Sequence, residues 1–503
     1  RYDYMLFDRR ALLSPGSLVG AHLQIGDSTN RYRIVANDRT RIITDPADGR
    51  LTDNPPSDMS YRVELVVGQL IIRNGATVEI TDADGGRTVR RGYLNAGDLV
   101  LTNFAWLTHP LGTVDSEFGL DLTITNALTI STNSRIDVSG RGYLGGRSGG
   151  NGGNVGRTLG NTINGGSASR NGGSYGGLGA LGIVSPVVNA VYGSFRDPNE
   201  VGSGGGSDNG PAGNGGGLVR ISAQQVSLDG QILANGGDGV TWGGGGSGGG
   251  IKITTSTLRG SGLIQANGGR GSGATGAGGG GGRIAVLYET ATGFDFGAIQ
   301  ARGNTGASDS AAGTIYFRRG NEVGQFIVRG NGRETPLPPT LAGENVVLDN
   351  SVVSATNINV ATLWLTNGAV LRHPGAELTN EYRLEINVNT LTISTNSRID
   401  VSGRGYLGAR SGGNGGNVGR TLGNTTQGGS DRRNGGSYGG LGGLGRINAG
   451  LINATYGSFR NPDELGSGGG SDNGPAGNGG GLVRISAQQV SLDGQILANG
   501  GDG

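Results

Sequence analysis

The sequence predicts an all-β protein, a right-handed parallel β-helix (β-solenoid) with glycine-rich flanking lobes and a small N-terminal β module. Three observations predict this class: a tandem repeat of about 264 residues, a shorter period inside it, and 108 glycines in 503 residues. Glycine at one residue in five is about three times its ordinary usage. A β-helix suits such a chain because each coil needs only a few inward aliphatic side chains.

The long repeat covers much of the chain. Residues 122–239 recur at 386–503, with an offset of 263 that becomes 264 after one inserted residue near Asn448. The stretches 202–239 and 466–503 are identical, glycine-rich loops included. Tandem duplication preserves loops and core positions alike, whereas selection on a single active site does not. Because the first copy runs on from Gly239 into Val240, we expect the repeat unit to continue past residue 503.

A shorter period of 31 to 33 residues lies inside the unit. It is marked by paired apolar positions that flank one polar residue, the alternation of a half-buried strand. The pairs are Val219/Ile221, Ile251/Ile253, Ile284/Val286 and Ile315/Phe317. We expect the first three pairs to point inward and to stack in rows, with glycine-rich turns between coils.

Three parts are expected along the chain. Residues 1–65 read as a small β-barrel or sandwich module, a cap of the kind that protects an open sheet edge. Residues 66–334 form unit one with a glycine-rich lobe at 141–217, and residues 335–503 form a truncated unit two with a lobe at 404–481.

Each lobe is either a flexible excursion or an ordered extended segment. Recurring apolar residues favour order, because buried anchors are expected to hold the lobe on the flank of the helix. In the two units these anchors are Leu159, Leu178, Tyr192 and Phe195, and Leu422, Leu441, Tyr456 and Phe459.

Several glycine-rich motifs carry a resemblance. They are the stretch 134–143 (SRIDVSGRGY), Tyr192-Gly193-Ser194 followed by 201–206, and 215–221 leading to 232–237. The sequence resembles the glycine-rich repeat regions of very large, adhesin-like surface proteins of bacteria, and its N-terminal stretch resembles small β modules found between such repeats. The resemblance implies a β-helix and a cell-surface setting, and it brings no catalytic residues with it.

Composition narrows the function. The net charge of +1 does not favour nucleic acid or an anionic membrane as partner. The absence of cysteine excludes disulfides and thiol chemistry. No apolar run approaches the ~18 residues of a membrane-spanning helix. Membrane insertion is therefore not expected in this segment.

Candidate catalytic residues are few. His109 and His373 occupy equivalent positions before proline, which favours a turn role, and His22 stands alone. Some β-helix enzymes cleave polysaccharides with clustered carboxylates on one strand face, but here acids such as Asp137 and Asp229 are scattered and suit turn caps. We expect no catalytic, cofactor-binding or metal site.

Calcium is the ligand that the loops suit best. Residues 45–49 (DPADG) with Asp53 offer hard oxygen donors without the EF-hand spacing, and residues 207–210 (SDNG) form a second candidate. An Asp-Gly turn explains the same residues without a metal.

These observations predict a non-catalytic, secreted structural or adhesive repeat protein, part of a long cell-surface stalk or filament. Its expected partners are further copies or a covalent continuation along the axis, and surface glycans. The alternative is a β-helix protein that binds or cleaves polysaccharides, and a third class is a carbohydrate- or ice-binding module, against which the interrupted threonine pattern argues.

Overall fold

The chain is all-β in the computed structural model, which describes residues 5–7, 15–16, 18–25, 30–51, 61–64, 66–81, 89–183, 187–330, 332–445 and 450–503. Within these ranges the helical turns with described bounds are the short 3₁₀ segments η1 (Pro46–Asp48) and η3 (Phe296–Ala298). No helix there has the length and apolarity that crossing a bilayer requires. The all-β class predicted from the sequence is therefore confirmed.

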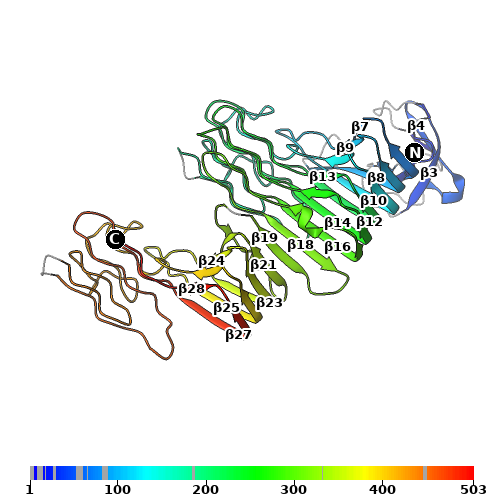
Figure 1. Cartoon of the computed structure of the whole chain (residues 1–503). Helices are drawn as coiled ribbons and strands as arrows, with labels where there is room; N and C mark the ends of the chain where they lie inside the picture. The colour runs from blue at the N-terminus through cyan, green and yellow to red at the C-terminus, as the bar shows by residue number, and fades with distance from the viewer. Residues whose placement is uncertain are drawn as a thin grey trace.

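The N-terminal residues form a five-stranded antiparallel sheet of their own. Its order is β1 (Met5–Phe7), β4 (Arg41–Thr44), β3 (Arg31–Asn37), β2 (His22–Ile25) and β5 (Tyr61–Glu64). Alternate residues of β3 and β4, among them Ile34 and Ile42, enter a separate small core with Leu23 and Leu51. This sheet lies at one end of the molecule (Figure 1).

One long sheet of 12 strands runs through the rest of the chain. In chain order its strands are β6 (Val66–Ile72), β8 (Val89–Leu101), β10 (Glu117–Ile130), β12 (Leu218–Leu228), β14 (Gly250–Arg259), β16 (Arg283–Thr292), β18 (Thr314–Arg319), β19 (Gln325–Arg329), β21 (Asn345–Asp349), β23 (Asn357–Thr366), β25 (Leu384–Ile393) and β27 (Val483–Leu492). Neighbours pair in parallel, except that β18 and β19 are antiparallel.

Two shorter parallel sheets face the long one. The first contains β7 (Thr77–Glu79), β9 (Trp106–Thr108), β11 (Arg135–Asp137), β13 (Gln231–Leu233), β15 (Leu263–Gln265) and β17 (Ile299–Gln300). The second contains β20 (Thr335–Pro336), β22 (Val352–Ser354), β24 (Val370–Arg372), β26 (Arg398–Asp400) and β28 (Gln495–Leu497). Except at β18 and β19, which follow each other in the long sheet, the chain alternates between the long and the short sheets. Aliphatic side chains from both fill the space between them.

The predicted right-handed parallel β-helix is wrong. The strands form one 12-stranded sheet and separate six- and five-stranded sheets, not a closed solenoid. The short sheet breaks between β17 and β20, where the antiparallel β18–β19 pair enters the long sheet. In the described part of the chain the glycine-rich segments form isolated bridges such as Thr158–Thr162 instead of strands. Glycine has low strand propensity, and these segments bond to one another outside regular strands, for example from the Gly173 nitrogen to the Gly245 oxygen at 2.9 Å.

The predicted inward rows are confirmed. Val219 pairs with Ile251 and Ile251 with Ile284, while Ile221 pairs with Ile253 and Ile253 with Val286. All six side chains are buried in one core cluster. Alternation of apolar and polar residues fixed this register, because a shift of one residue would turn every aliphatic side chain to the other face.

The glycine-rich lobes only partly follow their predicted anchors. In unit one Phe195 is buried and Leu178 and Tyr192 are half-buried, but Leu159 is exposed. In unit two Tyr456 is half-buried, and the expected burial of Leu422, Leu441 and Phe459 is wrong because these side chains are exposed. The division at residues 65 and 334 stays a prediction.

Candidate functional site

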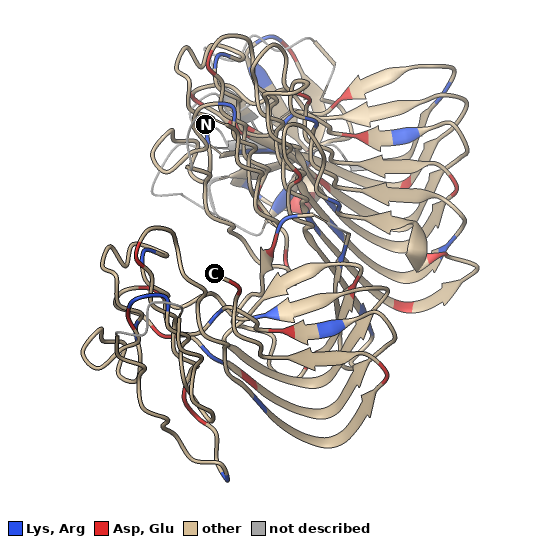
Figure 2. Ribbon diagram, turned by 60° about the vertical axis from the view of Figure 1, so that its left-hand side comes forward, with Lys and Arg blue, Asp and Glu red and all other residues tan. Residues whose placement is uncertain are grey.

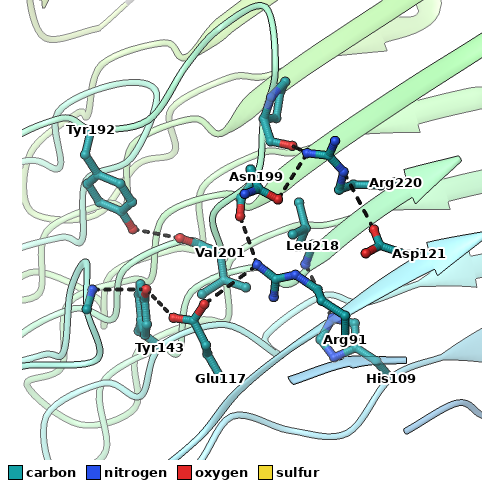
Figure 3. Close-up of polar contacts among 12 residues, drawn as sticks. Arg91, His109, Glu117, Asp121, Tyr143, Tyr192, Asn199, Val201, Leu218 and Arg220 are labelled. Atoms are coloured by element: carbon teal, nitrogen blue, oxygen red, sulfur yellow. Dashed lines mark hydrogen bonds and ion pairs between the residues drawn. The ribbon is translucent and has the colours of Figure 1, made fainter. Parts of the chain in front are cut away.

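A cluster of charged and polar side chains lies where the unit-one lobe meets the long sheet (Figure 3). Glu117 and Asp121 of strand β10 each lie two residues from Gly119, and Arg91 on β8 pairs in register with Gly119. A Cβ atom at Gly119 would lie 2.8 Å from Nη1 of Arg91. Glycine at this position therefore lets the Arg91 side chain cross β10.

Arg91 connects the sheet to the lobe. Its Nη2 atom lies 3.8 Å from Oε1 of Glu117 and donates a 3.0 Å hydrogen bond to the backbone oxygen of Asn199. Tyr143, from the start of the lobe, donates a short hydrogen bond to Oε2 of Glu117. Both Glu117 and Arg91 are nearly enclosed, with side-chain exposures of 4% and 11%. A buried carboxylate is thus matched by a cation and a hydroxyl, as burial requires.

Burial controls the protonation of the neighbouring groups. It raises the pKa of the Tyr143 hydroxyl well above its usual range, and the nearby Glu117 adds to this effect. Burial also raises the pKa of Glu200, with a further contribution from Glu117. The pKa of Asp121 is raised by burial as well, against the opposing attraction of Arg91 and Arg220.

A second row of charges lies on the sheet face opposite the core. Strand pairing aligns Asp121, Arg220 and Lys252 across β10, β12 and β14. Lys252 Nζ and Arg220 Nη1 lie 2.7 and 3.0 Å from the same carboxylate oxygen of Asp197 in the lobe. Arg220 also donates to Oδ1 of Asn199 at 3.1 Å. The single lysine of the chain therefore forms an ion pair that links the long sheet to the lobe.

His109 connects the segment after β9 to the start of β12, where the lobe ends. It is fully buried; its Nδ1 atom lies 2.8 Å from the Pro110 oxygen, and its Nε2 atom lies 3.4 Å from the backbone nitrogen of Leu218. Burial lowers the pKa of His109 to about 3. The neutral ring therefore donates through Nδ1 and accepts through Nε2. His373 has the same contacts with Pro374 and Leu482 in unit two.

The other predicted site residues are engaged within the fold. Asp137 accepts a hydrogen bond from the Ser139 nitrogen at 3.0 Å, a turn cap as expected, and Asp229 accepts one from the Ser261 nitrogen at 3.1 Å, in the next turn of the stack.

The two calcium candidates have protein partners as well. Asp45 caps Ala47 and pairs with Arg33, and Asp208 pairs with Arg170 at 2.6 Å. Asp53 lies outside the described residues. Over the described ranges no three His, Asp or Glu side chains gather in a metal-binding arrangement; the proposed calcium sites gain no support from this geometry.

Unit two has a shallow pocket at the equivalent of the charged row. It has a volume of about 550 Å³. It is lined by Asn357, Arg383, Glu385, Ile386, Asn387, Arg484, Ile485 and Ser486. At this place Arg484 donates a 3.3 Å hydrogen bond to Asn461 of the lobe. Two guanidinium groups beside one carboxylate suit an anionic polar ligand.

The Arg91 cluster was not predicted from the sequence, because its members come from β8, β10 and the lobe. Two of them, Glu117 and Tyr143, recur as Glu381 and Tyr406 in unit two, which is the one signal that pointed to them.

The class defined by fold and site is an all-β protein of stacked parallel sheets with glycine-rich lobes clamped by buried polar groups. Comparisons with protein-family models, with curated proteins and with solved structures find no match to this chain.

Proposed function

We propose that the chain is a non-catalytic structural or adhesive segment of a repetitive extracellular protein, a length of a cell-surface stalk or filament. One observation carries this proposal: a single 12-stranded sheet passes through both copies of the repeated stretch, 122–239 and 386–503. Each further unit would add strands at the same end of this sheet, so that copy number sets length. The N-terminal sheet and β27 lie at opposite ends of this stack (Figure 1).

The charges support a structural role. Among the described residues, positive and negative side chains are interspersed along the stack (Figure 2). The most enclosed groups, Arg91, Glu117 and His109, hold the lobe to the sheet. The resemblance of the repeat motifs to glycine-rich regions of large bacterial surface proteins supports the extracellular setting.

Surface labelling tests this function. Antibodies against the chain should label intact source cells, and negative staining of the native material should show elongated particles. Labelling that requires cell lysis, or compact particles only, would contradict the proposal. So would reproducible cleavage of pectin, alginate or bacterial glycans that a single substitution such as Asp121→Asn abolishes.

The pocket in unit two favours a second function, binding of acidic surface glycans. Arg383 and Arg484 line it with part of their guanidinium groups accessible. Titration with oligogalacturonate should show binding that Arg484→Ala removes. Arg220→Ala is the matched control, because Arg220 is already engaged by Asp197 and Asn199. Equal binding by wild type and R484A would dismiss this second function.

A further inference from the structure

Two identical stretches of sequence have different surroundings. Residues 202–239 include β12 and β13, and residues 466–503 include β27 and β28. Val226 and Leu228 of β12 are fully buried, whereas their counterparts Val490 and Leu492 are each 50% exposed. The difference arises from what packs against the strands, since the amino acids are the same.

In unit one, the following strands cover this surface. Strand β14 pairs in parallel with β12 and places Ile251 beside Val219 and Ile253 beside Ile221. Strand β15 covers β13 in the same way. Strands β27 and β28 are instead the last strands of their sheets.

The lobe shows the same contrast. Phe195 is 2% exposed and packs edge-on against Tyr316 and Phe326, with ring centroids 5.4 and 4.8 Å away. Its counterpart Phe459 is 90% exposed. Aromatic side chains gain strongly from burial, and no ring among the described residues of unit two packs against Phe459.

Glycines of the lobe add an independent observation. Gly176 and Gly177 donate hydrogen bonds of 3.0 and 2.9 Å to the Gly281 oxygen, and a Cβ atom at Gly177 would lie 2.3 Å from the Ala312 oxygen. The counterparts Gly439 and Gly440 have open space around them. The close approach that requires glycine is present in unit one alone.

We infer that the unit-two end face, formed by β27, β28, Gly439–Gly440 and Phe459, is a docking surface for a polypeptide with the sequence of residues 240–336. This segment would pair in parallel with β27 as β14 pairs with β12, and its two aromatic rings would cover Phe459 as Tyr316 and Phe326 cover Phe195. The inference rests on the proposed function as a structural repeat protein and names the partner of one of its surfaces.

Hydrogen exchange gives a direct test. A variant of the full chain carries residues 240–336 appended after Gly503, which reproduces the Gly239–Val240 junction. Residues 219–233 and 483–497 have the same sequence, so their peptides have one mass and are measured together. The unextended chain should give two isotope envelopes of equal intensity, one slow and one fast. The extended chain should give a single slow envelope, because residues 483–497 should exchange at least tenfold more slowly than in the unextended chain.

The matched control carries Asp in the appended segment at the positions of Ile253 and Val286, and it should retain two envelopes. Two envelopes in the extended chain, or one envelope in the control, would overturn the inference. A single slow envelope in the unextended chain at high concentration that splits on dilution would assign the face to a second copy and would also overturn it. None of these results depends on surface labelling of cells, so the proposed function fails or stands separately.

Discussion

At the scale of single residues, His109 shows how a buried polar group is kept uncharged by its contacts. Both ring nitrogens face backbone groups, Pro110 on one side and Leu218 on the other. Charging the ring would replace the acceptor at Nε2 by a second donor that faces the Leu218 nitrogen. The same arrangement at His373 indicates that each unit depends on a neutral histidine.

Acid should therefore destabilise the fold through these histidines. The folded-state pKa of His109, about 3, lies below the unfolded value of 6.5. Below pH 6.5 the unfolded chain therefore binds more protons than the folded chain, and the free energy of unfolding falls as the pH drops from 6.5 toward 3. At pH 5 the loss is about 2 kcal/mol for such a group. Urea unfolding at pH 7 and pH 5 measures it. His109→Gln should reduce the pH dependence, and an unchanged difference between the two pH values would refute this account.

The Arg91 cluster leads to a second residue-scale prediction. Glu117→Gln keeps a hydrogen-bond acceptor for Tyr143 but leaves the enclosed Arg91 without its anionic partner. Removing one partner of a buried pair costs about 3 kcal/mol. Glu79→Gln is the control, because Glu79 pairs with Arg141 at an exposed site, where pairs are worth less than about 1 kcal/mol. Thermal unfolding of both variants checks the ranking, and equal losses would contradict it.

At the scale of strands, β14 should tolerate charge on one face only. Ile253 is fully buried in the rows of the core, whereas Thr254 beside it is exposed. Ile253→Asp should destabilise the protein by more than about 3 kcal/mol because an unpaired carboxylate would be buried. Thr254→Asp should change stability by less than about 0.5 kcal/mol. Denaturant midpoints measure both, and similar losses would dismiss the register.

Strand periodicity explains which features could be predicted from sequence. Alternation at Val219/Ile221 and its repeats is a local signal, so it predicted the strands, their inward faces and their stacking correctly. The closed helix was wrong because closure depends on how glycine-rich segments pair, and glycine carries no side-chain pattern. Phe195 and Phe459 occupy equivalent positions in the repeat, so both were predicted to be buried. The prediction failed for Phe459 because burial also depends on neighbours that are distant in sequence. The Arg91 cluster, which joins separate elements, was invisible for the same reason.

At the scale of the whole molecule, length should increase in fixed steps with copy number. Between β12 and its counterpart β27 the long sheet advances by eight strand neighbours. At about 4.8 Å per strand, one unit adds roughly 38 Å. Small-angle scattering of the chain and of a variant with residues 240–503 duplicated should show this increase in maximum dimension. An increase in cross-section at constant length would be incompatible with end-to-end stacking.

The direction of the long sheet also determines how the molecule responds to tension. Hydrogen bonds between neighbouring strands run along the stack. A force applied between the N-terminal sheet and β27 is therefore parallel to these bonds and breaks them one after another, in the unzipping geometry. Strands pulled lengthwise past one another would instead resist together, in shear. Under tension the chain should therefore unfold at low force in many small steps, and each step should release one strand with the glycine-rich segment next to it. If the chain serves as the proposed stalk, it would lengthen under a sudden load before it breaks, and strands that separate one at a time could pair again when the force falls.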